Sequence, residues 1–297
     1  MKTKDMLRGV WAPITTPFLS NEEVNYDGLK ENMSVYAQSG IHGYLALGSN
    51  GENKSLLQDE KQKVLSTIIK YKSPAQKVMV GCIAESTIET IQMAKAVASA
   101  GADCVTLLPP SYFAKQMTDE ALTRYFVDVA DSVNIPVLVY CAPQFSAGTI
   151  LSTSLIQEIA KHPNIVGMKD SSTGNIDKYI DIAPEDFVVM AGSANIFGHT
   201  LERGSVGGIM SLSNIFPKFC VTLYDAFMSN DKETFNKLNE KMLLLNTEIS
   251  GKGGVAAVKA AMDMVGLAGG VPRLPLLPLS EEIRSDIKKL LEVEGMI

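Results

Sequence analysis

The sequence predicts a (β/α)8 barrel with a C-terminal extension of three helices, and three observations lead to this fold class. Eight short apolar runs, each bounded by turn residues, are typical of strands buried on both faces. Each run precedes a segment with helical periodicity, at a repeat of roughly 25 to 35 residues, which implies a parallel sheet with right-handed crossovers. The chain of 297 residues exceeds the ~250 residues of such a barrel by about the length of an extension.

The predicted strands follow the apolar runs in order. An open doubly wound sheet is the alternative fold, but it normally shows a glycine-rich fingerprint after its first strand. The segment Ala12–Pro17, at the end of the first run and just beyond it, is not such a fingerprint. The eight runs span residues 8–15, 43–47, 77–83, 102–108, 136–142, 164–170, 187–191 and 206–210.

A helical segment follows each predicted strand. Gly40 provides a C-terminal stop for the first helix, and Ser86 with Glu89 forms a capping-box pattern at the start of the third. The eight segments span residues 26–39, 59–72, 86–100, 119–133, 152–161, 175–183, 196–202 and 217–228.

The residues after position 230 predict the extension. Three helices are expected at 232–248, 255–265 and 281–292, and the middle one follows the glycine-rich Gly251–Gly254. The segment 266–279 is expected to be an ordered loop packed on the barrel. We therefore predict a catalytic barrel at 1–230 and a helical extension at 231–297.

Composition and charge exclude several classes of function. The net charge is −6 and no basic cluster occurs, so a nucleic-acid partner is not expected. No apolar run reaches the ~20 residues that span a bilayer, and the polar start of the chain has no signal-peptide core, so no membrane partner is expected. Four widely spaced cysteines indicate a reduced, cytoplasmic protein without disulfides. Three scattered histidines predict neither a metal site nor a cofactor.

Lys169, at the end of the run 164–170, is the leading candidate for catalysis. Lysine is seldom buried, and the carboxyl ends of barrel strands are where such folds keep their chemistry. Burial disfavours the charged form, and a free amine can attack a carbonyl to form a Schiff base. The alternative is a lysine that reaches water and has no chemical role.

Three other strand ends carry candidates. Tyr140 is expected beside Lys169, where its phenol can move protons, unless it is simply a core aromatic. The turn Gly48–Glu52 can hold a carboxylate with its amides, or it is a plain tight turn. Gly192–Asn195 resembles a phosphate-binding turn but contains no basic residue, so phosphate is not favoured.

Six motifs together resemble the dihydrodipicolinate synthase/N-acetylneuraminate lyase family over essentially the whole chain. They are Thr16–Phe18, Gly48–Glu52, Val139–Pro143, Gly167–Ser172, Gly207–Ser211 and Arg273–Leu276. The resemblance implies a class I pyruvate-dependent aldolase on a (β/α)8 barrel with a C-terminal helical extension. It also implies a homotetramer.

The resemblance implies catalytic roles for four residues. Lys169 would form the imine with pyruvate or another 2-oxo acid. Tyr140 and Ser49 would relay protons. Tyr112 would complete the relay of a neighbouring subunit, with Ser111 as the alternative residue for that position.

Substrate contacts are implied in the same way. Asn50 and the backbone of Ile209 would hold the carboxylate region, with Gly192 and Ser211 also at the substrate. Ser211 suits a hydroxylated substrate. Asn50 stands where a threonine is common in the family, which should alter the carboxylate pocket.

Two further departures from the family pattern bear on the substrate. The lysine-pathway synthase has an arginine shortly after the tyrosine of the fifth strand, and this arginine grips the carboxylate of the aldehyde. Gln144–Gly148 contains none, so that charged contact is missing. Ala194 and Asn195 stand where sialate lyases have acidic residues that bind sugar hydroxyls.

The sequence thus predicts a lyase that makes or cleaves a C–C bond between pyruvate and an aldehyde, with 2-keto-3-deoxy sugar acids or 4-hydroxy-2-oxo acids as substrates. Alternatives on the same imine are a 4-hydroxy-tetrahydrodipicolinate synthase-like activity, a sialate lyase-like activity, and a 2-oxo acid dehydratase or deaminase, since a fold does not fix a reaction. Alternatives from other classes are a non-catalytic 2-oxo acid-binding protein and a metal-dependent aldolase.

Overall fold

The computed structural model describes residues 3–297 and contains a closed parallel barrel whose strands follow one another in chain order. Every strand lies inside one of the predicted apolar runs, and nearly every strand residue is buried. The predicted (β/α)8 barrel is therefore confirmed. The strands are β1 (Gly9–Pro13), β2 (Gly43–Ala46), β3 (Lys77–Cys82), β4 (Cys104–Leu107), β5 (Val137–Cys141), β6 (Ile165–Asp170), β7 (Val188–Ala191) and β8 (Gly207–Ile209).

The helices also follow the predicted order, with one short addition. This addition is α1, a polar segment before the first strand that the sequence pattern did not indicate. The helices are α1 (Thr3–Leu7), α2 (Tyr26–Ala37), α3 (Gln58–Tyr71), α4 (Thr87–Ser99), α5 (Asp119–Asp131), α6 (Thr153–Ile159), α7 (Ile176–Ile182), α8 (Ala194–Glu202), α9 (Pro217–Met228), α10 (Lys232–Glu248), α11 (Ser250–Met264) and α12 (Glu281–Val293).

Local hydrogen bonds explain several helix ends. The Ser86 side chain accepts from the Glu89 backbone N–H at 3.3 Å and caps α4, as its sequence position predicts. The Ser193 side chain accepts from the Asn195 backbone N–H, so α8 begins two residues before its predicted start. Gly40 follows α2 with φ +86°, a left-handed conformation that glycine adopts without strain.

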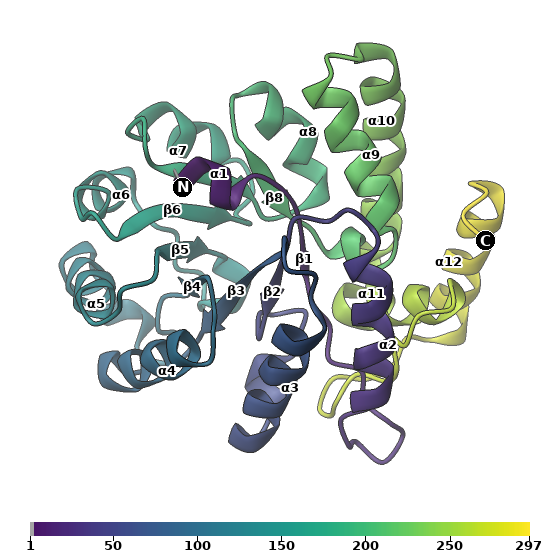
Figure 1. Ribbon diagram of the computed structural model, residues 1–297, viewed down its shortest axis with the longest axis horizontal. Helices are drawn as coiled ribbons and strands as arrows, with labels where there is room; N and C mark the ends of the chain where they lie inside the picture. Colours follow the sequence, from purple (N-terminus) through teal and green to yellow (C-terminus); the bar gives the residue numbers. More distant parts are fainter. Residues whose placement is uncertain (1–2) are drawn as a thin grey trace. The chain divides into compact units, whose positions relative to one another are not determined.

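Contacts within the chain group it into two compact units. The first contains the described residues up to Gly9 together with Lys77–Ile209, and the second contains Val10–Gln76 and Met210–Ile297. In the first unit, α4 to α7 lie outside strands β3 to β6 (Figure 1). The predicted division into 1–230 and 231–297 stays a prediction.

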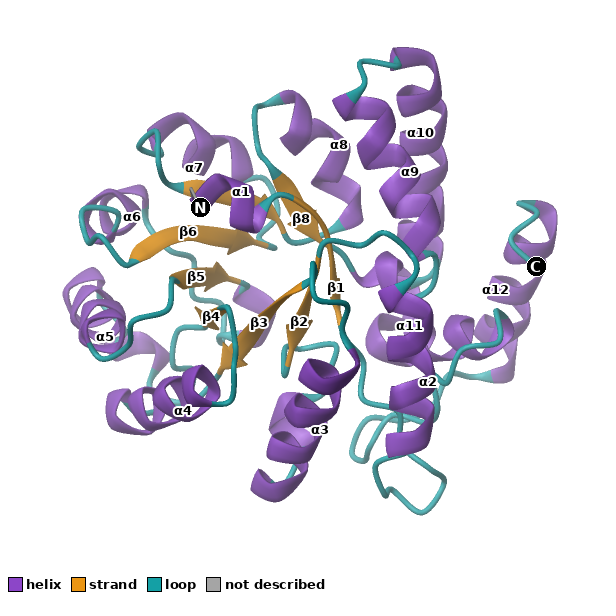
Figure 2. Ribbon diagram, viewed as in Figure 1, coloured by secondary structure: helices purple, strands orange, loops and turns teal. Residues whose placement is uncertain are grey.

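The second unit holds the C-terminal helices. The helix α10 lies beside α9, and α11 packs against both α10 and α12 (Figure 2). The glycine-rich start of α11 breaks at Gly254, whose φ and ψ of 55° and −139° are not helical. The regular part of α11 therefore begins near residue 255, where the sequence predicted it.

The segment 266–279 is ordered by contacts inside the second unit. Val271 forms a β-bridge with Phe18. The Asn32 side chain donates to the Ala268 carbonyl and accepts from the Ala268 backbone N–H, both at 2.8 Å. These contacts tie the loop to α2 and to the chain just before it.

The four cysteines are free thiols in the interior. Burial raises the pKa of Cys82 to about 12, so its thiol stays protonated at neutral pH. Among the helices of the described chain, none is both long and apolar enough to cross a membrane.

Candidate active site

Lys169 and Tyr140 lie side by side at the carboxyl ends of β6 and β5. The register of the two strands pairs these residues directly, so their side chains leave the sheet on the same face. The Lys169 Nζ atom lies 4.2 Å from the centre of the Tyr140 ring, and both residues are only 4% exposed. In this arrangement the amine can form an imine with the carbonyl group of a substrate. The phenol beside it can donate and accept the protons that imine chemistry requires.

Lys169 is one of two buried lysines in the described chain, and the two differ in their partners. Lys259 is fully buried and forms an ion pair with Glu52. Lys169 has no carboxylate partner among the described residues, and its amine faces the Tyr140 ring instead. A buried amine without a paired charge costs folding free energy. Such a cost is typical of a residue retained for chemistry.

Ser171 joins this pair, although sequence reasoning did not select it as a site residue. Its Oγ atom lies 3.4 Å from the Tyr140 hydroxyl oxygen and 3.2 Å from the Gly192 carbonyl oxygen, and it can donate to either. A Cβ atom built on Gly192 would overlap Ser171 Oγ and lie 2.5 Å from the Asp170 carbonyl oxygen. Glycine at position 192 therefore makes room for the Ser171 hydroxyl.

Asp170 sets the turn that presents Ser171. Its side chain points to the opposite face of β6 from Lys169, because side chains alternate along a strand. The Asp170 Oδ1 atom accepts from the Ser172 backbone N–H at 3.0 Å and from the Ser172 hydroxyl at 2.6 Å. Burial raises the pKa of Asp170, and the hydrogen bonds from Ser172 oppose that rise. The sequence signal for this turn is the Asp-x-Ser spacing.

The end of β8 carries the next predicted site residue. Ile209 is the last residue of this strand and is fully buried. The preceding Gly208 pairs with Ala191 of β7. A Cβ atom on Gly208 would lie 2.7 Å from the Phe197 ring, so glycine there lets α8 pack closely on the strand.

The second unit presents its own set of polar groups after β2 and β8. Asn50 Nδ2 donates to Ser211 Oγ at 3.0 Å, so two residues predicted to bind substrate are in direct contact. Ser49 precedes Asn50 and is partly buried. The turn is held by a hydrogen bond in which the Thr16 hydroxyl donates to the Gly51 carbonyl at 2.8 Å.

Tyr112 points to solvent from the loop after β4. Its side chain is 81% exposed, and Phe113 packs edge-on against it with ring centres 5.0 Å apart. The Glu85 carboxylate anchors the loop by accepting from the backbone N–H groups of Ser111 and Tyr112 and from the Ser111 hydroxyl, each at 2.9 Å. The Ser111 hydroxyl is therefore engaged, whereas the Tyr112 ring projects outward.

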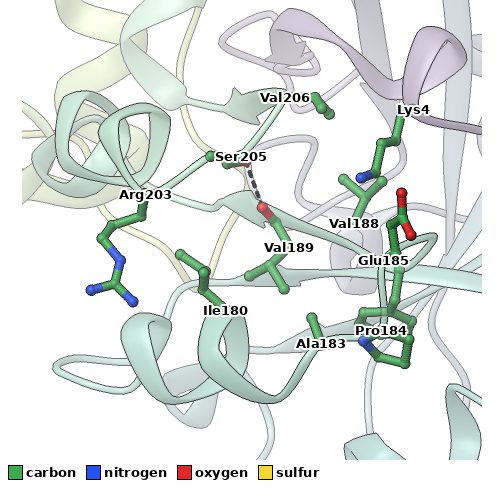
Figure 3. A pocket seen from close by; sticks show the side chains of 12 residues that line it. Lys4, Ile180, Ala183, Pro184, Glu185, Val188, Val189, Arg203, Ser205 and Val206 are labelled. Carbon is green, nitrogen blue, oxygen red and sulfur yellow. Dashed lines mark hydrogen bonds between the residues drawn. The ribbon is translucent and has the colours of Figure 1, made fainter.

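A separate cavity of about 170 Å³ lies at the amino ends of β7 and β8 (Figure 3). Lys4 of α1 points toward it, and Ser205 in its wall donates to the Val189 carbonyl at 2.6 Å. Barrel enzymes keep their chemistry at the carboxyl ends of the strands. This cavity is therefore not the candidate site.

Comparisons with known proteins agree with this geometry. A family model described as "Dihydrodipicolinate synthetase family" matches residues 6–294. A relative in Emericella nidulans, named "Probable 4-hydroxy-2-oxoglutarate aldolase, mitochondrial", is 32% identical over 97% of this chain and 95% of its own. A 4-hydroxy-tetrahydrodipicolinate synthase from Methanospirillum hungatei is 31% identical over 96% of this chain and 99% of its own.

Solved structures give the same result. The chloride-inhibited dihydrodipicolinate synthase from Acinetobacter baumannii, complexed with pyruvate, superposes with a TM-score of 0.92. It is 28% identical in sequence, and the match covers 98% of this chain and all of the other.

Proposed function

Since the chain belongs to the dihydrodipicolinate synthetase family, we propose that it acts on 4-hydroxy-2-oxo acids through an imine on Lys169. The family and the named relatives establish the class, a pyruvate-dependent lyase that uses a lysine Schiff base. The observation that carries the proposal is the buried Lys169 amine, which has no carboxylate partner in residues 3–297 and lies 4.2 Å from the Tyr140 ring centre.

The proposed cleavage balances without a cofactor. The Lys169 amine adds to the C2 carbonyl of the 2-oxo acid and water leaves, which gives a protonated imine. Loss of the proton from the C4 hydroxyl breaks the C3–C4 bond, and the electron pair moves to the imine nitrogen. The aldehyde departs and an enamine of pyruvate remains. Protonation of C3 and addition of water then release pyruvate and the free amine.

We assign the remaining roles by position. Tyr140 takes the proton from the C4 hydroxyl and returns it in the reverse direction, and Ser49 is the next hydroxyl in the relay. Asn50 and the backbone of Ile209 hold the carboxylate region of the 2-oxo acid. Gly192 and Ser211 lie beside the substrate, and the contact of Ser211 with Asn50 supports a shared role.

Two observations favour 4-hydroxy-2-oxo acids over the lysine-pathway substrate. The relative from Emericella nidulans is named for 4-hydroxy-2-oxoglutarate, whose cleavage yields pyruvate and glyoxylate. The segment after β5, Pro143–Gly148, contains no arginine to grip the carboxylate of aspartate semialdehyde. The relatives named as 4-hydroxy-tetrahydrodipicolinate synthases keep that activity as the second candidate.

Borohydride trapping with pyruvate tests the imine directly. We expect a reduced pyruvate adduct on the peptide that contains Lys169, because among the described residues this is the only buried lysine amine without a carboxylate partner. The peptide that contains Lys259 should stay unmodified and serves as the internal control. An adduct absent from a folded preparation would refute the imine and favour a binding protein without turnover.

The same preparation then decides the aldehyde. Pyruvate formation should be fastest with 4-hydroxy-2-oxoglutarate and slower with 2-keto-3-deoxy sugar acids. Condensation of pyruvate with aspartate semialdehyde should be slowest, since Pro143–Gly148, directly after β5, contains no arginine. Aspartate semialdehyde as the best acceptor would instead assign the chain to the lysine pathway.

We further propose a cytoplasmic homotetramer in which Tyr112 serves the site of a neighbouring subunit. The 81% exposure of its ring on a loop anchored by Glu85 supports this role. The four buried free thiols suit a reducing compartment.

Subunit mixing tests the role of Tyr112. A Lys169→Ala variant keeps Tyr112, and a Tyr112→Phe variant keeps Lys169, so each should be weakly active alone. After the two are unfolded and refolded together, mixed assemblies should regain activity, because one intact site forms from two damaged subunits. Activity that stays at the sum of the separate variants would show that Tyr112 acts in its own subunit or not at all.

A further inference from the structure

The turn that carries Ser49 and Asn50 is bordered by two residues with left-handed backbone. Leu47 has φ +54° and Glu52 has φ +52°, and neither is glycine. Such a conformation costs free energy and persists only where the surrounding structure imposes it.

The buried Glu52 side chain has two partners inside the second unit, one in α11 and one in the loop that follows it. Its carboxylate forms an ion pair with the Lys259 amine of α11, and the two side chains are 1% and 0% exposed. The Glu52 Oε2 atom also accepts from the Arg273 backbone N–H at 2.8 Å. The Lys259 amine donates in addition to the Val271 carbonyl at 2.8 Å. One carboxylate thus connects the turn to α11 and to the loop after it.

Arg273 is itself fixed in place. Its guanidinium makes a two-pronged contact with the Glu60 carboxylate at 2.6 and 2.7 Å and donates to the Ser55 carbonyl at 2.9 Å. The centre of the Phe18 ring lies 4.3 Å from the Arg273 Cζ atom and 4.4 Å from the Lys259 Nζ atom. These contacts therefore hold both ends of the segment from Glu52, in the turn, to Glu60, in the first turn of α3.

We propose that the Glu52–Lys259 ion pair, supported by Arg273 and Glu60, is a positioning device that holds Ser49 and Asn50 in their working geometry. Glu52 touches no reacting atom in this scheme and acts through the backbone of the turn. The inference rests on the proposed function, because it takes Ser49 and Asn50 as site residues.

The test separates positioning from stability. Lys259→Met leaves the Glu52 carboxylate buried without its partner, so we expect a marked loss of thermal stability. The double variant Glu52→Leu with Lys259→Met replaces the pair by apolar side chains of similar size, so its melting temperature should lie above that of Lys259→Met alone. It should stay below that of the unmodified protein, because the Arg273 N–H and the Val271 carbonyl lose their side-chain partners. Relative to the unmodified protein, the double variant should nevertheless have a higher KM for the 2-oxo acid and a lower kcat. A combined fall in kcat/KM of about 100-fold is the scale expected when reacting groups are displaced by about 1 Å.

Lys77→Met provides the matched control. Lys77, at the amino end of β3, pairs with Asp103 at 3.0 Å in the first unit, which does not contain the turn. Its loss should change stability at most, with KM and kcat unaltered. A double variant with the KM and kcat of the unmodified protein would overturn the positioning role.

Glu60→Gln keeps the test decisive if the double variant does not fold. Glutamine keeps the shape of the Glu60 side chain and one oxygen that can accept from Arg273, so the change is mild. It removes the charge that holds the Arg273 guanidinium and so loosens Arg273 and, through it, Glu52. We expect a smaller rise in the same KM, and a folded variant with an unchanged KM counts against the proposal. Imine trapping in the unmodified protein keeps the two ideas apart. Without an adduct the proposed function fails, whereas an adduct together with an undisturbed double variant refutes the positioning role alone.

Discussion

Replacement of Lys169 by alanine is expected to lower turnover by a factor on the order of 10⁴ to 10⁶, the scale that follows loss of a covalent nucleophile. The reason is that no other amine of the described chain is both buried and without a carboxylate partner. Borohydride should then trap no pyruvate on the protein. Steady-state kinetics and peptide mass spectrometry check both effects. Turnover within tenfold of the unmodified rate would contradict the assignment.

The same position carries a prediction about stability. Lys169→Met keeps a side chain of similar length and removes an amine that has no ion-pair partner in the described chain. We therefore expect an inactive protein whose melting temperature is unchanged or higher. This combination is typical of sites where function opposes stability. A large fall in melting temperature would instead indicate that the amine is structural.

Most of the fold follows from the sequence because each strand is buried on both faces. Such strands consist of nearly uninterrupted apolar residues, and all eight strands lie within the predicted apolar runs. The difficult points are local. The helix α1 is short and polar, so no periodicity marks it. The helix α11 includes one turn before Gly254 that the sequence did not predict, and the non-helical backbone of Gly254 separates this turn from the predicted part.

The candidate site was predictable where neighbouring strands fix it. Tyr140 and Lys169 end adjacent strands, so the parallel register alone brings them together. The approach of Ser171 to Tyr140 was not predictable, since it depends on a turn made by Asp170 and on the absence of a side chain at Gly192.

The ion pair of Glu52 with Lys259 lies outside any local pattern as well. The two residues are about two-thirds of the chain apart, and neither hydrophobic periodicity nor spacing marks a long-range charge pair. Their burial is visible only once α11 is placed against the turn. Long-range polar contacts of this kind are where a single sequence carries the least information.

Tyr140→Phe is expected to lower kcat by roughly 10²- to 10⁴-fold, the contribution typical of a positioned general acid or base. The change removes only the phenol oxygen, and the ring that faces the Lys169 amine remains. Lys169 should therefore still be trapped with pyruvate, while the proton transfer at the C4 hydroxyl fails. Ser171→Ala removes the hydroxyl that contacts the phenol and should have a smaller effect, about fivefold, as for loss of one neutral hydrogen bond.

Tyr179→Phe is the matched control for Tyr140→Phe. Tyr179 is another buried tyrosine of the first unit, and its hydroxyl donates to the Leu151 carbonyl at 2.6 Å. Loss of the hydroxyl removes this donor from a buried carbonyl group, which should cost about 1 to 3 kcal/mol of stability, and kcat should be retained. If both tyrosine variants lose stability and neither loses kcat, Tyr140 is a core aromatic. If only Tyr140→Phe loses kcat while its imine still forms, the phenol moves the proton that breaks the C–C bond.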